Sequence, residues 1–568
     1  MSGWQSDLAP SPVQQTLTAP TAHNPDGSSI TGPVLARFTD MPEGAASLPV
    51  QGGVTGIVTC KRPVPVSLDT SAARLVRRAN DDDPGEVVPP SDWAFADCST
   101  DPFPGRADPA SLCVKSGFDP RYAYELTYTG KDPLVQGIGF AAVRDINAFF
   151  RDAPSTEAAP NPVAGAIKWE VGVGYSQSGN FLRSFINLGF NTAPDGGRVF
   201  DGIMPIIAAR QVPLNLRFGV PGGTAELYEP GSEGVVWWAD HEDRSRGLPR
   251  AGLLTRCTAA GDCPKVFDVF GSAEFWGLRK SPDLIGPDAA GDIPAPGNVR
   301  RYYLPGVTHS GGAGGFPTDV AALPPVPTCD LPANPNPASW TIRALTRRLT
   351  DWVASGTEPP ASVSPTLANG DLVAPRAAAM GFPSIPGKPS PDGKSNPLMV
   401  YDFGPDFRAV DLSGVVDRQP PALMRMVAVR VPRVDADGNE TSGVASVQSR
   451  VPLGTYLGWN VRSKGYYGGR GCGFMGGYIP FAATRAEREA SGDPRLSLEE
   501  RYGSTRRSSP AFARPPTRWS RKASCSRRTP RSSSNRPRTA QSFARRRPEL
   551  SAAVVRVRKP RDGNRGRA

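Results

Sequence analysis

The chain has 568 residues, a hydrophobic content of 39% and a formal net charge of +11. This length exceeds what one hydrophobic core usually organises, so we expect one large domain with satellite regions. No run of about 18 or more uncharged apolar residues is present, which argues against a transmembrane helix, and the N-terminus lacks the basic start and apolar stretch of a secretion signal. The sequence as written predicts a cytoplasmic protein, with a periplasmic or secreted location as the alternative if the true N-terminus is longer.

The 62 prolines and 61 glycines predict many loops and short strands rather than long helices. Eight cysteines are too few for a dense disulfide scaffold. Cys257 and Cys263 bracket a turn that a local bridge could close, and Cys98 and Cys113 bracket a proline-rich loop. Reduced thiols in loops are the alternative. No cysteine spacing matches a two-plus-two zinc pattern, and we expect neither a metal nor a cofactor.

The positive charge is concentrated at the C-terminal end. Residues 504–568 hold 20 of the 65 Lys and Arg residues and 2 of the 54 acidic residues, so this segment carries +18 and residues 1–503 carry −7. Its Arg, Ser and Pro content leaves too few large apolar residues to offset the entropy of ordering, so we expect disorder. A basic tail can bind nucleic acid through phosphate contacts, but no nucleic-acid-binding fold accompanies it, and we expect no specific nucleic-acid partner. The abrupt change in composition suggests the hypothesis that the tail is an out-of-frame translation.

Strands and helices alternate through the middle of the chain. Residues 1–118 are β-rich and are expected to supply the first strands of a larger sheet. Later elements are expected as strands at 122–128, 168–173, 199–207, 266–270 and 299–304 and as helices at 139–151, 180–188 and 338–353. This alternation predicts an α/β fold with a mostly parallel sheet and helices on both faces.

The remaining segments are expected to surround that sheet. Residues 119–362 form the core, and a loop-rich insertion at about 211–262 falls where a cap would lie. Residues 363–503 are expected to form a β-rich accessory region in which the sequence indicates no chemistry. Four aromatic residues of the insertion could line a pocket, although structural packing is the commoner role of buried tryptophans: Trp237, Trp238, Phe218 and Tyr228.

Residues 171–183 run from an apolar strand through a small-residue turn into a helix, which places Ser176 where a nucleophile would stand. A sharp strand-to-helix turn needs small residues two positions before and after the serine, and Gly174 and Ser178 meet this requirement. The pattern departs from Gly-x-Ser-x-Gly because glycine arrives one residue late, at Gly179. An incidental Gly/Ser turn is the alternative, and Ser178 is less suited to be the nucleophile because Asn follows it at the second position.

A serine hydroxyl needs a neighbouring imidazole to take its proton, and the chain has three histidines. His309 follows the strand expected at 299–304, in a loop whose glycines let backbone and imidazole approach the serine closely. His23 lies in the N-terminal segment and His241 lies among acidic residues, and both are expected to be solvated. His309 is therefore the expected general base, with a surface histidine in a flexible loop as the alternative.

The third residue should be a carboxylate that fixes the imidazole tautomer, and in hydrolases with this strand-turn-helix motif it lies between the serine and the histidine in the chain. Glu274 fits best because it follows the strand expected at 266–270 and a turn. Asp283 is the runner-up. Asp268 lies inside that strand, and two further aspartates fall in a later Pro/Gly loop: Asp288 and Asp292.

The expected positions also bring the three residues to one place. Ser176, Glu274 and His309 each follow an expected strand, and ligands gather at the carboxyl ends of parallel strands. The backbone N–H of Gln177, at the start of its helix, is the expected donor to an oxyanion. A second donor is suggested only in the loop near 130–137.

At these residues the sequence resembles the alpha/beta-hydrolase superfamily, and more closely a bacterial group known as alpha/beta hydrolase domain-containing proteins, of largely undefined substrate. The resemblance spans roughly residues 30–503 and rests on six blocks: 124–128 with 131–133, 142–145, 174–179, 272–277, 306–309, and 493–495 with 500–502. It implies an alpha/beta-hydrolase fold with a cap and places Ser176, Glu274 and His309 at the triad positions. Two departures are a missing helical ending after Gly503 and the absent secretion signal.

Together these observations predict a serine hydrolase that cleaves small-molecule carboxylic esters through an acyl-enzyme intermediate. An amidase or a thioesterase with the same three residues is one alternative. A non-catalytic binding protein on a hydrolase fold is another, and a nucleic-acid-associated protein acting through residues 504–568 is a third.

Overall fold

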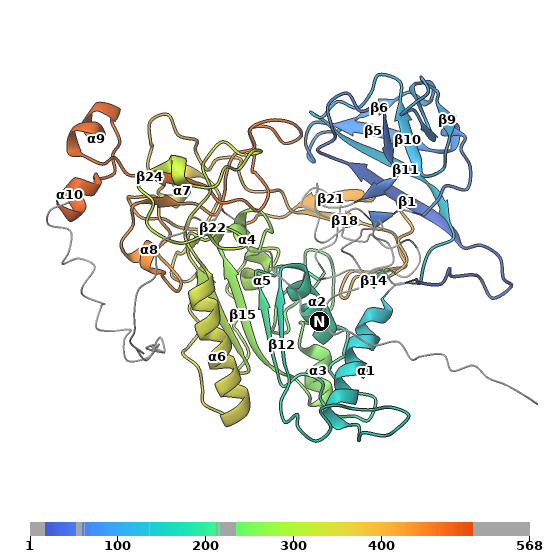
Figure 1. Ribbon diagram of the computed structural model, residues 1–568, viewed down its shortest axis with the longest axis horizontal. Helices are drawn as coiled ribbons and strands as arrows, with labels where there is room; N and C mark the ends of the chain where they lie inside the picture. Colours follow the sequence, from blue (N-terminus) through green and yellow to red (C-terminus); the bar gives the residue numbers. More distant parts are fainter. Residues whose placement is uncertain are drawn as a thin grey trace, which may run out of the picture. The chain divides into compact units, whose positions relative to one another are not determined.

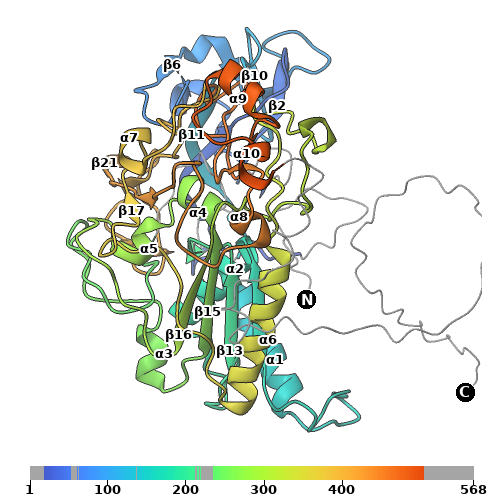
Figure 2. The same ribbon diagram turned by 90° about the vertical axis from the view of Figure 1, so that its left-hand side faces the viewer.

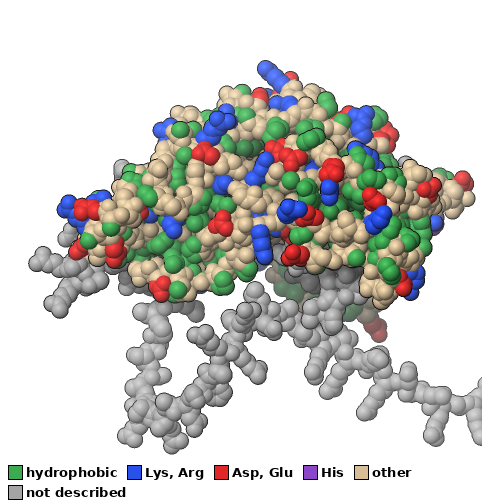
Figure 3. Space-filling view, turned by 90° about the horizontal axis from the view of Figure 1, so that it is seen from above, with side chains coloured by type: hydrophobic (Ala, Val, Ile, Leu, Met, Phe, Trp, Pro, Cys, Tyr) green, Lys and Arg blue, Asp and Glu red, His purple; other side chains and the backbone are tan. Residues whose placement is uncertain are grey.

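The computed structural model describes residues 18–52, 60–61, 63–135, 137–211, 214–215, 218 and 234–503. The basic segment 504–568, for which the sequence predicts disorder, lies outside these residues, as does Tyr228. Among the helices of the described part, none has both the length and the hydrophobicity that crossing a bilayer requires. On the face drawn in Figure 3, basic and acidic side chains are interspersed rather than gathered by sign.

The parallel sheet is the part of the fold that positions the site. It has the order β12-β13-β15-β16, and its strands are β12 (Val171–Tyr175), β13 (Gly202–Ile206), β15 (Lys265–Gly271) and β16 (Val299–Leu304). Every neighbouring pair runs parallel. All four strands overlap the ranges expected from the sequence, so the prediction of a parallel sheet is confirmed.

Helices cover both faces of this sheet (Figure 1). Ile203 and Val266 point into a core shared with α1 (Ile138–Asp152), α2 (Gln177–Asn187) and α3 (Thr255–Ala260). Their sequence neighbours Met204 and Phe267 point to the opposite face, where they pack with α6 (Ser339–Ser355). Successive side chains of a strand point to opposite faces, so strands covered on both sides are mostly apolar, and β13 is apolar throughout. Buried charged side chains interrupt the pattern at Asp268 of β15 and Arg301 of β16.

The N-terminal strands form sheets of their own. One antiparallel sheet has the order β1-β11-β5-β6, and a second has the order β2-β10-β7. Their bounds are β1 (Thr31–Phe38), β2 (Ser47–Pro49), β5 (Arg74–Arg78), β6 (Glu86–Val88), β7 (Trp93–Ala94), β10 (Ser111–Val114) and β11 (Ala123–Lys131). The strand expected at 122–128 is β11, and its eight paired positions with β1 hold it in the antiparallel sheet. Within the described residues, none of these strands pairs with the parallel sheet.

Short elements make up most of the rest. Near the N-terminus, β3 (Gln51–Gly52) pairs with β4 (Cys60–Lys61) and β8 (Ala96–Asp97) with β9 (Arg106–Ala107). Beyond β15 lie α4 (Ser272–Trp276) and α5 (Ser281–Ile285). The other strands are β14 (Leu214–Asn215), β17 (Leu372–Val373), β18 (Met399–Asp402), β19 (Phe407–Arg408), β20 (Ser413–Gly414), β21 (Ala422–Met426), β22 (Val431–Pro432), β23 (Gly454–Tyr456) and β24 (Tyr478–Pro480).

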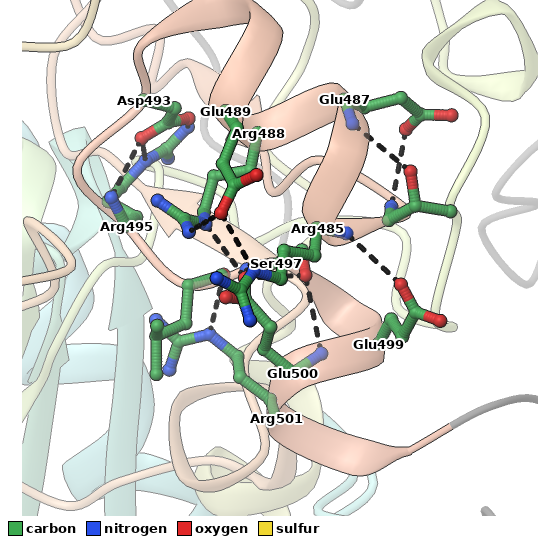
Figure 4. Close-up of polar contacts among 12 residues, drawn as sticks. Arg485, Glu487, Arg488, Glu489, Asp493, Arg495, Ser497, Glu499, Glu500 and Arg501 are labelled. Atoms are coloured by element: carbon green, nitrogen blue, oxygen red, sulfur yellow. Dashed lines mark hydrogen bonds and ion pairs between the residues drawn. The ribbon is translucent and has the colours of Figure 1, made fainter.

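The last described segment contains four short helices: α7 (Ala377–Met380), α8 (Val447–Arg450), α9 (Arg485–Ser491) and α10 (Leu498–Tyr502). Figure 2 shows α9 and α10 close together, and Figure 4 shows the polar contacts that hold them. Arg488 of α9 donates to Glu500 of α10 at 2.8 Å. Between the helices, the buried Arg495 donates to Asp493 Oδ2 at 2.6 Å and to the Ile479 carbonyl at 3.1 Å. This pair anchors the segment to β24.

Three disulfides cross-link the described chain. Cys98–Cys113 and Cys257–Cys263 are the two local bridges that the sequence leaves open against free thiols. The third, Cys329–Cys472, joins residues 143 positions apart and was not anticipated. Sequence spacing points only to local bridges, because a long-range bridge depends on the fold.

The turn after β12 has a strained backbone. Ser176 has a φ of 51° and a ψ of −115°, a combination that residues other than glycine rarely adopt. A Cβ at Gly174 would lie 2.3 Å from the Ser178 carbonyl oxygen, and a Cβ at Gly179 would lie 2.8 Å from the Cβ of Ala208. The Ser178 hydroxyl both accepts from the Tyr175 N–H and donates to the Tyr175 carbonyl, each at 2.8 Å. A hydroxyl therefore ties the turn where the usual motif has glycine.

We expect Gly174→Ala to destabilise the protein by about 1–3 kcal/mol, because the new methyl group would overlap backbone atoms that cannot move away. Gly139→Ala is the matched control, since Gly139 lies in α1 with no atom within 4 Å of a Cβ, and it should be neutral or stabilising by up to about 1 kcal/mol. Urea unfolding of both variants measures the difference. Equal stabilities of the two variants would contradict this account of the turn.

We expect Glu170, directly before β12, to make the stability of the protein depend on pH. Burial raises the pKa of Glu170 to about 7, nearby Asp201 adds to this, and Arg151 opposes it. Because the folded protein holds this proton up to a higher pH than the unfolded chain does, the stabilisation is complete below about 4.5 and is lost as the pH rises through about 7. The free energy of unfolding of Glu170→Gln, relative to that of wild type, should therefore rise by about 1–2 kcal/mol from pH 4.5 to pH 8, after allowance for solvent screening.

Chemical unfolding at both pH values, with the exposed Glu358→Gln as control, measures this difference. A gain that does not grow with pH would show that the Glu170 carboxyl is not held in its neutral form by the fold.

Candidate active site

His309 lies within hydrogen-bond distance of the two other side chains that the sequence singles out, Ser176 and Glu274. His309 Nε2 is 2.8 Å from Ser176 Oγ, and His309 Nδ1 is 2.6 Å from Glu274 Oε1. Ser176 follows β12, Glu274 lies in α4 directly after β15, and His309 lies in the loop after β16. Because these strands are parallel, their carboxyl ends meet at one edge of the sheet.

Glu274 is fully buried and both of its carboxyl oxygens are engaged. Oε1 faces the imidazole, while Oε2 accepts the Gly271 N–H at 2.5 Å. The next residue back, Ala273, donates its N–H to the Val307 carbonyl at 3.1 Å, which links the acid-bearing turn directly to the histidine loop. A carboxylate at Nδ1 favours the tautomer whose proton sits on that nitrogen. Nε2 is then left to accept a proton from Ser176.

The imidazole of His309 is held on one face by an aromatic ring from the C-terminal region. The Phe474 ring stacks on it with centroids 4.6 Å apart and planes 20° apart. The Phe474 carbonyl also accepts from Thr308 Oγ1 at 3.1 Å and from the His309 N–H at 3.4 Å. Sequence reasoning missed this residue and expected no chemistry in residues 363–503. No spacing pattern marks Phe474, and its contact with His309 exists only in the fold.

Two asparagine side chains also fix the loop that carries His309. The Gly306 carbonyl accepts the side-chain amides of Asn334 at 2.9 Å and Asn336 at 3.0 Å. Both asparagines are buried. Since a buried carbonyl with two donors resists displacement, the loop that carries His309 is fixed before any substrate binds.

Two of the other acid candidates, Asp283 and Asp268, belong to a buried ion cluster instead. Asp283 pairs with Arg183 at 2.8 Å and with Lys280, and Asp268 pairs with Lys280 at 3.0 Å. Burial opposes ionisation of Asp283, but Arg183, Lys280 and Arg301 together hold its pKa below the usual range. Asp283 is therefore committed to its cationic neighbours, and the imidazole Nδ1 is occupied by Glu274.

The other two histidines lie apart from this arrangement. His23 is exposed, as expected. His241 is half-buried rather than solvated, with its ring edge-on to Trp237 at 5.2 Å. It forms a backbone bridge with Ala251 in the same insertion.

The described aromatic residues of the insertion are structural. Trp237 and Trp238 are buried, and their indole N–H groups donate to the Ala251 carbonyl at 2.6 Å and to Asp268 Oδ2 at 3.0 Å. Phe218 packs into the core of the N-terminal sheets. These contacts favour the packing role that the sequence analysis gives as the commoner one.

The proposed oxyanion donor, Gln177, is the first residue of α2, so its N–H points out of the helix end. In the part of the chain that the structure describes, no acceptor is paired with this N–H. Of the loop suggested for the second donor, Gly130 lies in β11 and Gly137 precedes α1, while Gln136 lies outside the described residues. The second donor stays a prediction. Within the described ranges, no group of three or more His, Cys, Asp or Glu side chains could hold a metal ion.

Comparison with known proteins gives one finding. A family model described as "Alpha/beta hydrolase domain" matches residues 86–510, well over half of the chain. No curated protein and no solved structure matches. The matched range contains the parallel sheet, the turn at Ser176, the loops of Glu274 and His309, and Phe474. The chain therefore belongs to the alpha/beta hydrolase domain family.

Proposed function

We propose that this protein is a serine hydrolase that cleaves carboxylic esters, with Ser176 as nucleophile, His309 as general base and Glu274 as the orienting acid. The family indicates a hydrolase-type function. The observation that carries the finer proposal is the continuous pair of short contacts, 2.8 Å from Ser176 Oγ to Nε2 and 2.6 Å from Nδ1 to Glu274. A hydroxyl, an imidazole and a buried carboxylate in this order can activate a serine.

The proposed reaction has two halves. Ser176 Oγ attacks the carbonyl carbon while His309 Nε2 takes its proton, and the N–H of Gln177 donates to the tetrahedral oxyanion. The carbon–oxygen bond to the alcohol then breaks, and His309 returns the proton to the departing alcohol. Water repeats the attack on the acyl-enzyme, with the same proton transfers, and releases the acid. Glu274 remains ionised and stabilises the imidazolium in both halves.

The same groups could act on amides or thioesters. A series of substrates with one acyl group and a nitrophenyl ester, an anilide or a thioester as leaving group would rank the three activities. A non-catalytic binding protein is less well supported, because a strained Ser176 and a fully buried Glu274 are unfavourable features that a mere scaffold does not need.

Ser176→Ala should abolish covalent labelling by a fluorophosphonate probe and reduce ester turnover by at least about 10⁴-fold, because it removes the attacking oxygen. His309→Ala should reduce turnover by a similar factor. Gel fluorescence and nitrophenol release measure the two effects, with Ser355→Ala and His241→Ala as controls of the same residue types. Labelling that persists in Ser176→Ala, or unaltered turnover in His309→Ala, would reject the assignment.

Phe474→Leu should lower kcat by about 2- to 12-fold with little change in KM, since a stacked aromatic pair contributes about 0.5–1.5 kcal/mol beyond its buried area. Leucine keeps much of the volume but offers no ring to the imidazole. The exposed neighbour Met475, changed to leucine, is the control. A raised KM with unchanged kcat would instead place Phe474 in substrate binding.

A further inference from the structure

A carboxylate from the C-terminal region touches both loops that carry the acid and the histidine. Glu440 Oε1 accepts from Ser272 Oγ at 2.5 Å, and Glu440 Oε2 accepts from the Gly306 N–H at 2.7 Å. Oε2 also accepts from the Tyr303 hydroxyl. Ser272 is two residues before Glu274, and Gly306 is three residues before His309.

All three partners act as donors to this carboxylate. Gly306 offers a backbone N–H, which can only donate, from a backbone with a φ of 59°. Burial raises the pKa of Tyr303 well above its usual range, with the Glu440 charge adding to the effect, so its hydroxyl keeps its proton. Burial raises the pKa of Glu440, while the hydrogen bonds from Ser272, Tyr303 and the Gly306 N–H oppose that rise. In its ionised form the carboxylate is acceptor-only and accepts from all three donors at once. Glu440 therefore works as a clamp between the two loops.

The backbone on either side of Glu440 is itself held in place. The preceding residue, Asn439, is buried, and its side chain accepts from the Tyr456 N–H at 2.9 Å and donates to the Gly454 carbonyl at 3.1 Å, both in β23. On the other side, the Val444 N–H donates to the Tyr303 carbonyl at 2.7 Å. The segment around Glu440 is thus fastened to β23 and to β16, independently of the catalytic loops.

We propose that Glu440 is a positioning residue that sets the distance between Glu274 and His309. This inference rests on the proposed function, because it gives that pair a catalytic role. Glu440 contacts neither Ser176 nor the imidazole of His309. It acts by fixing Ser272 and Gly306, whose loops are also joined by the hydrogen bond from the Ala273 N–H to the Val307 carbonyl.

The test uses Glu440→Gln and Glu440→Ala in the full chain, with two readouts. The first is the strongly downfield proton resonance that His309 Nδ1–H should give in its short bond to Glu274, assigned by its absence in His309→Ala. The second is kcat and KM for a nitrophenyl ester. We expect the resonance to shift or broaden in Glu440→Gln and to vanish in Glu440→Ala. We expect kcat to fall by about 10-fold and about 100-fold respectively, with KM within about 2-fold, because small misplacements of catalytic groups are costly.

A double-mutant cycle separates positioning from general loosening. If Glu440 acts through the acid and histidine pair, Glu440→Gln should lower kcat by less than about 2-fold when Glu274→Gln is already present. Asp493→Asn is the structural control, because Asp493 is a buried acid of the same region that pairs with Arg495 away from the site. It should lower the unfolding temperature and leave the resonance and kcat unchanged.

An unchanged resonance and kcat in Glu440→Gln, or a full-sized loss in the Glu274→Gln background, would overturn the proposal, and so would equal effects from Asp493→Asn. If Glu440→Ala does not fold, the glutamine variant and the cycle decide. Failure of the proposed function is a different result: fluorophosphonate labelling would persist in Ser176→Ala, while the proton resonance would still report on the clamp.

Discussion

The parallel pairing of four strands is the constraint on which the rest of the site depends. Ser176 and His309 are 133 residues apart, yet β12 and β16 end at the same edge because every strand between them runs in the same direction. Apolar side chains on both faces, packed under α2 on one side and α6 on the other, fix that register. A shift of one strand by one residue would turn buried side chains to the wrong face. The packing of the core therefore fixes the relative positions of Ser176, Glu274 and His309.

The turn at Ser176 shows how local chemistry meets that constraint. Two glycines, Gly174 and Gly179, allow the backbone approach that the turn needs, while the Ser178 hydroxyl ties back to Tyr175. The departure from Gly-x-Ser-x-Gly therefore loses no essential contact. The glycine that arrives one residue late lies where a methyl group would meet Ala208.

The sequence predicted the parallel sheet and singled out the three side chains that the structure brings together, because both have local signals. Apolar runs mark the strands, and Ser176, Glu274 and His309 come one, three and five residues after the ends of β12, β15 and β16. The strand β11 was also predicted, but its pairing with β1 and β5 in a separate sheet was not, since pairing depends on long-range register rather than on composition. The contacts of Phe474 and Glu440 and the Cys329–Cys472 bridge were not predicted for the same reason. Their partners lie more than 130 residues away in the chain.

The C-terminal region is therefore part of the site rather than an accessory to it. The Tyr467 hydroxyl donates to Asp81 of the N-terminal region at 2.8 Å, and five residues later Cys472 is bonded to Cys329. Two residues beyond that bridge, Phe474 stacks on His309. A continuous stretch of chain thus fastens the N-terminal region, the loop after β16 and the imidazole to one another. Ordering the histidine loop costs conformational entropy, and contacts from the N-terminal and C-terminal regions offset that cost, which explains how a loop can hold His309 at short distances from Ser176 and Glu274.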